Sequence, residues 1–225
     1  MASLAFNLLW LRTALGWRTP LAALAAWYLA DMLSGLIHMY MDYRPCPMGA
    51  GLDKAFFYMG SRASPEYDQL KREALARVGL IDKVAFEFKY HHPRPEVLGR
   101  RSLVYQVKST VLLVSLPMSL VLNLAWFLVP FPGWLATGIL ILIVGGTLSQ
   151  YFHGSLHRPS NPWFIGVMRR LHLLMTPEAH DVHHQTLRRD FAVINGWSNP
   201  AVNVLFAFLL HRGALSPAGL EPVVE

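Results

Sequence analysis

The chain has 225 residues, of which 53% are hydrophobic and only 15% are charged, and its formal net charge is +6. Soluble domains carry about 25% charged residues, so this composition excludes an ordinary soluble domain and indicates a membrane protein. Cys46 is the only cysteine, which excludes an internal disulfide and a thiolate metal cluster, and no motif accompanies the basic residues that would indicate a nucleic-acid partner.

Three segments are long and apolar enough to cross a membrane: residues 21–41, 103–129 and 134–152. The second and third are joined by "VPFPG", whose prolines and glycine predict a tight hairpin. Pro117 lies within the second segment, where neighbouring helices can accommodate it. We expect an all-α integral membrane protein with three to four transmembrane helices and additional interfacial helices. Residues 1–225 form one domain in this interpretation.

The region between the first two spans is polar, and about residues 44–85 form an inserted loop in this interpretation. Within it, "SPEYDQLKREALARVGL" predicts a short amphipathic helix that Ser64 caps and Pro65 begins. The basic residues predict the orientation of the chain. Twelve Lys and Arg lie from Arg44 to Lys108 and none lies in the hairpin. By the positive-inside rule, the loop is cytoplasmic in a bacterial inner membrane.

Two short apolar segments follow the third span. They begin at Asn161 and Asn199, each of which precedes a proline, so the sequence predicts two asparagine-capped helices at the membrane interface. Residues 3–15, which include Arg12, are interpreted in the same way.

Eight of the ten histidines come to the cytoplasmic end of the predicted bundle. None lies in the hairpin or in the middle of a span. These histidines are His38, His91, His92, His153, His157, His180, His183 and His184. Such convergence from four separate segments indicates a metal site.

The spacing of these histidines supports the same interpretation. His153 and His157 are four residues apart, so they share one face of a helix. His180, His183 and His184 stand at positions i, i+3 and i+4, which again places them on one face.

The first span carries a stripe of Asp31, Gly35, His38 and Asp42 on one face. A carboxylate within a span is a candidate functional residue, and Asp31 or Asp42 could orient an imidazole through its second nitrogen. The third span has a stripe through Gly146 and Gln150, where small residues let a neighbouring helix or an acyl chain approach closely.

Eight imidazoles exceed the ligands of one zinc ion and suit two metal ions. Imidazole with some carboxylate can hold iron, which activates O₂, whereas zinc has no redox chemistry. Two irons at the mouth of a membrane bundle favour oxidation of an unactivated C–H bond in a lipid chain.

Several motifs together resemble the Kua/CarF lipid desaturases, which include plasmanylethanolamine desaturases and plant phosphatidylglycerol trans-desaturases. They are "YLADMLSGLIHMYMD", "EFKYHHPRP", "SQYFHGSLHR", "AHDVHH" and "FAVINGW". The resemblance implies a di-iron enzyme that uses O₂ and two electrons to insert a double bond. It also implies that the eight histidines are the iron ligands.

His172 is similar to a histidine of the plasmanyl-type members, which favours an alkyl-ether lipid and a plasmalogen product. We expect His172 to support the site from outside the ligand set. The chain departs from the family pattern in its longer loop from Cys46 to about Lys83, and in the arginines of "MRRLH".

The expected partners are a membrane phospholipid and a small acidic electron donor such as a cytochrome b5 or a ferredoxin. Four arginines are candidates for holding the lipid phosphate: Arg169, Arg170, Arg188 and Arg189. Three alternatives stay open: an acyl-phospholipid desaturase, a membrane hydroxylase with the same metals, and a non-enzymatic metal-binding protein.

Overall fold

The computed structural model describes residues 16–129 and 131–224, and every regular element in this part of the chain is a helix. Three helical stretches are long and apolar enough to cross a membrane. They are α2 (Arg18–Tyr43), the continuous stretch of α7 (Leu103–Thr110), η2 (Val111–Ser115) and α8 (Leu116–Leu128), and α9 (Gly133–Leu156). The all-α class and its membrane spans are confirmed, and the interpretation of residues 3–15 and Arg12 lies outside the described residues.

Large apolar side chains that are exposed identify the lipid-facing sides of these helices. Ile37 of α2 is 52% exposed, and Leu124 and Phe127 of α8 are 60% and 75% exposed. Side chains of this kind are stable in hydrocarbon, where no water has to be ordered around them.

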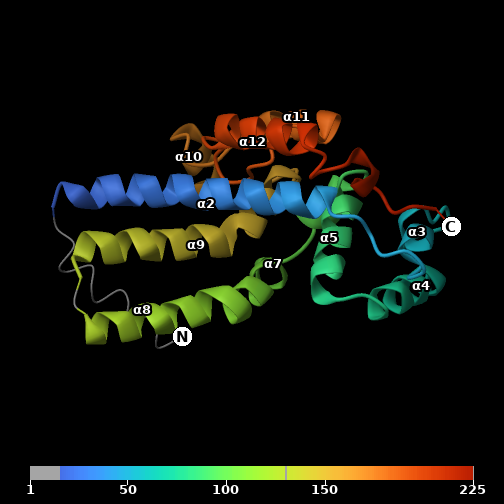
Figure 1. Ribbon diagram of the computed structural model, residues 1–225, viewed down its shortest axis with the longest axis horizontal. Coiled ribbons are helices and arrows are strands. Elements are labelled where there is room, and N and C mark those ends of the chain that lie inside the picture. Colours follow the sequence, from blue (N-terminus) through green and yellow to red (C-terminus); the bar gives the residue numbers. More distant parts are fainter. Residues whose placement is uncertain (1–15, 130, 225) are drawn as a thin grey trace.

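Helices α2 and α9 run in the same direction and pack closely, so their carboxyl ends meet at one end of the bundle (Figure 1). The contact depends on Gly145, where an added Cβ would lie 2.8 Å from the Cβ of Ala30. A Cβ at Gly146 would meet nothing within 4 Å, so no neighbouring helix approaches there, and the approach of an acyl chain at Gly146 stays a prediction. Gly145 rather than Gly146 therefore lets the two spans approach each other.

The second span contains one π-helical turn, Val111–Ser115, directly before Pro117. Proline removes a backbone donor and crowds the preceding turn, and a wider turn relieves both effects. The Ser115 hydroxyl lies 2.5 Å from that of Thr147 on α9, so the turn is also tied to the next span.

The polar region between the first two spans folds into helices α3 (Leu52–Phe56), α4 (Pro65–Ala76), α5 (Leu80–His91) and α6 (Pro95–Gly99). The Ser64 hydroxyl accepts a hydrogen bond from the Tyr67 amide at 3.2 Å, which confirms the predicted cap of α4. Phe86 and Tyr90 of α5 are buried against α3 and α4. This packing fixes the position of α5. The last residue of α5 is His91, the first member of the pair His91 and His92.

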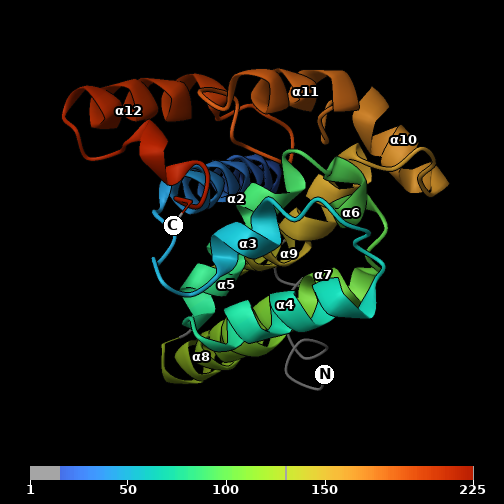
Figure 2. The same ribbon diagram turned by 90° about the vertical axis from the view of Figure 1, so that its right-hand side faces the viewer.

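The C-terminal region forms α10 (Trp163–Arg170), α11 (Pro177–Thr186), α12 (Asn199–His211) and a short 3₁₀ helix, η3 (Pro217–Gly219). Helices α10–α12 form a layer over α2 and run across the bundle (Figures 1 and 2). Their interfacial location stays a prediction, which the 80% exposure of Trp163 supports.

The predicted asparagine caps of α10 and α12 are wrong. The residues that precede these helices are Pro162 and Ser198. The Asn161 amide instead donates to the Ser155 carbonyl at 2.9 Å, and the Asn199 side chain accepts from the Ala192 amide at 2.9 Å. Both asparagines bind a neighbouring segment because tertiary packing brings a backbone group within reach.

Substitution of Gly145 by alanine should destabilise the bundle by about 1–3 kcal/mol. The added methyl group is attached directly to the helix backbone, so it cannot rotate away from the neighbouring helix. The matched Gly146→Ala variant should be neutral or stabilising by up to about 1 kcal/mol, since alanine favours helix more than glycine does. Thermal unfolding in detergent measures both. Equal midpoints for the two variants would contradict the packing described.

Candidate metal centre

The eight histidines predicted from the sequence lie together where α2, α5, α9 and α11 meet. The carboxyl ends of α2 and α9 supply His38, His153 and His157. Helix α5 and its cap residue supply His91 and His92, and α11 supplies the last three. The structure therefore brings the predicted residues together, and it divides them into two groups.

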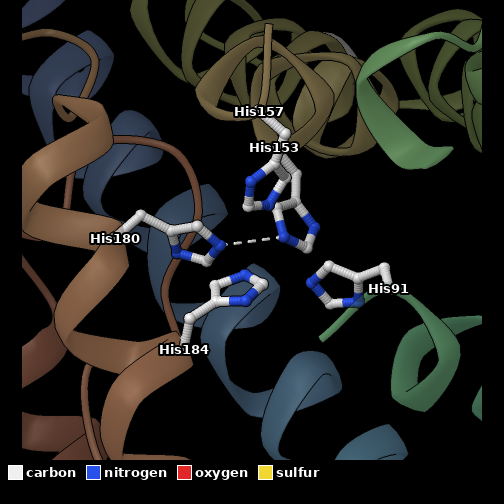
Figure 3. A group of neighbouring side chains, drawn as sticks. All are labelled: His91, His153, His157, His180 and His184. Carbon is white, nitrogen blue, oxygen red and sulfur yellow. Dashed lines mark hydrogen bonds between the residues drawn. The ribbon is translucent and has the colours of Figure 1, made fainter. Parts of the chain in front are cut away.

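The first group consists only of imidazoles. One ring nitrogen from each lies within 4.8 Å of all the others, and the rings point toward a common centre (Figure 3). The members are His91, His153, His157, His180 and His184. Within it, His153 Nε2 and His180 Nε2 lie 3.0 Å apart. We call it the five-imidazole group.

The second group combines three imidazoles with a carboxylate: His38, Asp42, His92 and His183. The three Nε2 atoms lie 3.3–3.5 Å from the carboxylate oxygens of Asp42. We call it the carboxylate group. Asp42 was expected to orient an imidazole through its second nitrogen, but it faces the same nitrogens that a metal would bind. It is therefore a candidate ligand.

The two groups are direct neighbours. The rings of His91 and His92, which belong to different groups, have centroids 4.4 Å apart. The rings of His38 and His153 also come from different groups, and their centroids are 4.9 Å apart. Two metal ions held by these groups would therefore lie close to each other.

Backbone carbonyls orient several of the rings. His38 Nδ1 lies 2.9 Å from the Phe191 carbonyl oxygen, and His183 Nδ1 lies 2.9 Å from that of Arg189. His91 Nδ1 contacts the Phe88 carbonyl in the same way. A proton on Nδ1 leaves Nε2 as the free acceptor, which is the form that binds metal. The sequence could not indicate these carbonyls, because a backbone partner has no residue-type signal.

The inward-facing atoms fit a metal because they lack other partners. Within the described residues, Nε2 of His91, His157 and His184 is buried without a hydrogen bond, and so are both carboxylate oxygens of Asp42. Leaving such atoms unpaired costs about 1–3 kcal/mol each. Nitrogen with one carboxylate and no thiolate is a donor set suited to iron, among other transition metals.

Burial keeps the imidazoles outside the spans in their neutral form. Desolvation, followed by the neighbouring imidazoles, holds the pKa values of His91, His92 and His180 well below the usual range. The same causes lower the pKa of His157 to about 3 and that of His184 to about 4. Neutral imidazole is the form that coordinates metal, so the site is ready to bind at neutral pH.

Asp31 does not orient an imidazole, contrary to expectation. One oxygen accepts from three consecutive amides, of residues 194–196, at 2.8–3.2 Å. The other accepts from the amide and the hydroxyl of Ser198 at 3.0 and 2.6 Å. Asp31 thus holds the loop after α11, and this loop carries Phe191, whose carbonyl orients His38.

His172 is exposed and has a left-handed φ of 56° just after α10, and it belongs to neither group. His172 was expected to support the metal site, but an exposed residue outside both groups does not match that role. Arg169 donates to the carbonyls of Met175 and Ser155, both at 3.1 Å, so its guanidinium holds the loop before α11. Arg170, Arg188 and Arg189 are exposed, and their role toward a lipid phosphate stays a prediction.

Lys89 is a functional candidate. From the sequence it was only one of the basic residues that predict the orientation of the chain. Its side chain is 1% exposed, and Nζ donates to the carbonyls of Met41 and Asp42 at 2.6 Å each. The partial negative charge at the carboxyl end of α2 stabilises the positive charge of Lys89. Burial lowers the pKa of Lys89 to about 8. Lys89 therefore fixes the helix end that presents Asp42.

Acidification is expected to destabilise the metal-free protein. The unfolded imidazoles titrate near pH 6.5, whereas the folded pKa values of His157 and His184 are about 3 and about 4. The unfolded state then binds more protons below pH 6.5, so the free energy of unfolding falls as the pH drops toward 4. Each imidazole contributes at most about 1.4 kcal/mol per pH unit. Denaturant titrations across this range measure the slope, and a flat profile would contradict the burial.

The two groups predict about two transition-metal ions per chain, measured by elemental analysis of purified protein. His183→Ala removes one of the four donors of the carboxylate group and should lower the content toward one. His172→Asn is the matched control, because asparagine tolerates a left-handed φ and the residue lies outside both groups. One ion in the wild type, or full content in His183→Ala, would be inconsistent with two separate groups.

Comparison with known proteins gives two matches. The sequence model of the lipid desaturase domain matches residues 76–211, which include seven of the eight histidines. The plasmanylethanolamine desaturase of Myxococcus xanthus is 24% identical over 197 residues. The alignment covers 85% of this chain and 58% of that relative, so the chain spans little more than half of the relative's length.

No solved structure matches the chain. The domain match covers more than half of the sequence, and its residues supply the whole five-imidazole group and two of the four members of the carboxylate group. The chain therefore belongs to the lipid desaturase domain family.

Proposed function

We propose that the protein is an O₂-dependent desaturase that holds two irons and introduces a double bond into the hydrocarbon chain of a membrane phospholipid. The observation that carries this proposal is the pair of neighbouring, buried histidine groups at one end of a membrane bundle. The carboxylate and five-imidazole groups would each hold one iron. Iron bound there would supply the oxidising power with which O₂, two external electrons and two protons take two hydrogens from the chain, giving an alkene and two waters.

The substrate that we propose is an alkyl-ether phospholipid, and the product is its vinyl ether, a plasmalogen. Two observations support this choice: membership of the lipid desaturase domain family and the name of the relative, which is a plasmanylethanolamine desaturase. Removing two hydrogens next to an ether oxygen gives a vinyl ether, whereas the same loss within an acyl chain gives an ordinary alkene.

The chain's own residues do three things in this reaction. Backbone carbonyls at Phe88, Arg189 and Phe191 hold imidazole rings in one orientation. Burial excludes water from the donor atoms, which strengthens electrostatic interactions and protects a reactive centre from side reactions. The Asp42 carboxylate adds a negative charge to one group only, so that the two metal positions have different charge.

The proposed location is a bacterial inner membrane with the metal centre toward the cytoplasm. The twelve Lys and Arg from Arg44 to Lys108 lie in the polar region between the first two spans and at the start of the second span, at the same end of the bundle as the histidines. This face would also attract an acidic electron donor such as a cytochrome b5 or a ferredoxin.

Lipid analysis of cells expressing the protein tests the function. In a host that contains alkyl-ether lipids but no plasmalogens, we expect oxygen-dependent formation of acid-labile lipids that have lost two hydrogens. His184→Ala should abolish the product by removing an iron ligand, and His172→Asn should preserve it.

Other outcomes identify the alternatives. A product that gains oxygen indicates a hydroxylase, and an acid-stable alkene indicates an acyl desaturase. Purified protein that holds zinc without iron, or metal without lipid oxidation, would overturn the redox proposal.

A further inference from the structure

Two of the carbonyls that orient histidines lie in the segment between α11 and α12, where the chain has no regular secondary structure. The Arg189 carbonyl accepts from Nδ1 of His183 at 2.9 Å. The Phe191 carbonyl accepts from Nδ1 of His38, also at 2.9 Å. The Phe88 carbonyl, by contrast, lies within α5, where the helix itself fixes it. Carbonyls outside a helix need other groups to hold them in place.

Two asparagines of α12 hold the same two peptide units from the other side. The amide of Asp190 donates to Asn203 Oδ1 at 2.8 Å. The amide of Ala192 donates to Asn199 Oδ1 at 2.9 Å. Each of these amides shares a planar trans peptide group with the carbonyl of the preceding residue, and the two groups point in opposite directions. Each asparagine is therefore joined to one imidazole through a single rigid peptide unit, and we call this chain a peptide relay.

Each relay has a second contact that fixes its peptide unit. Asp190 has a left-handed φ of 60°, which is uncommon for a residue other than glycine. Asn203 Nδ2 donates back to the Asp190 carboxylate at 3.0 Å, so a reciprocal pair holds this conformation. The other peptide unit lies against α2, because a Cβ added at Gly35 would be 3.1 Å from the Ala192 nitrogen. Both peptide units are thus held from two sides.

Both relays lead to the same half of the metal centre. Asn199 and Asn203 lie one turn apart, so one face of α12 holds both peptide units. The imidazoles at the other ends, His38 and His183, both belong to the carboxylate group. Their Nε2 atoms lie 3.4 and 3.3 Å from the Asp42 carboxylate. Helix α12 therefore acts on one of the two candidate metal positions.

We propose that Asn199 and Asn203 are positioning residues for the metal of the carboxylate group, each acting on one imidazole through a peptide relay. Hydrogen bonds in a chain polarise one another, so an amide bound to an asparagine makes the carbonyl of its own peptide a stronger acceptor. The imidazole that donates to this carbonyl is held more firmly, and its Nε2 gives more electron density to a metal. The proposal rests on the metal centre of the proposed function but not on the lipid reaction.

Nuclear magnetic resonance spectroscopy of the full chain in detergent, loaded with Zn²⁺, tests the relays one at a time. The measured quantity is the resonance of each imidazole Nδ1 proton, assigned from variants that lack one histidine. Asn199→Leu removes the oxygen at similar volume, so the His38 resonance should move upfield or be lost to exchange with water, while that of His183 stays. Asn203→Leu should do the reverse. Asn199→Asp keeps the oxygen and should preserve the His38 resonance.

Competition with a chelator measures the effect of the relays on metal affinity. Each leucine variant should bind one of its two Zn²⁺ ions about tenfold more weakly, the lower end of the loss when a hydrogen-bond partner of a metal-bound imidazole is removed. Ser64→Ala is the matched control, because Ser64 also accepts from a backbone amide but caps α4, which supplies no histidine. It should lower the thermal midpoint and leave both zinc affinities unchanged.

Two results would overturn the peptide relays. If both Nδ1 resonances responded to either leucine variant, the asparagines would only stabilise the C-terminal layer in general. Unchanged resonances and zinc affinities in the leucine variants would show that the rest of the segment holds the carbonyls without the asparagines.

The wild type supplies a measurement that does not depend on the folding of any variant. Loading with Zn²⁺ should shift the amide nitrogens of Asp190 and Ala192 more than that of Val193, whose amide donates to the Ser34 hydroxyl instead. Equal shifts at the three amides would contradict the relays. A wild type that oxidises no lipid would overturn the proposed function and leave all of these measurements unaffected.

Discussion

A carboxylate buried halfway along a membrane-spanning helix must find its partners inside the protein, and this requirement ties the molecule together. Asp31 accepts hydrogen bonds from three consecutive amides and from the backbone and side chain of Ser198. Hydrocarbon offers no alternative partner, so displacing the loop would leave a buried charge unpaired. The C-terminal layer is thereby fixed against α2.

This attachment reaches the metal centre through the backbone. The loop that Asp31 holds begins close to Phe191, which is fully buried and whose carbonyl orients His38. Helix α11 precedes the same loop and brings His183 toward Asp42 at 3.3 Å. The carboxylate in the middle of the span thus positions candidate ligands from two helices without belonging to either histidine group.

The two candidate metal positions differ in charge. Asp42 and Lys89 are both buried at the carboxyl end of α2, where Lys89 binds the last carbonyls and Asp42 faces three imidazoles. The five-imidazole group has no carboxylate among its members. Because a negative ligand stabilises the more oxidised form of a metal, the two positions would differ in their preferred oxidation state.

The sequence by itself determined the helical membrane class, the three spans and the eight histidines that converge. These follow from hydrophobic run length and from i, i+3 and i+4 spacing, which are local properties of a helix. Ser64 was predictable for the same reason, since a cap binds its own helix. Contacts between distant segments decided the rest. The asparagines at 161 and 199 do not cap their helices, and Gly145 rather than Gly146 forms the contact between the spans. Asp31 and Asp42 have different partners although they share one stripe. Residue type and spacing specify which face of a helix a side chain occupies, but only tertiary packing specifies what that face meets.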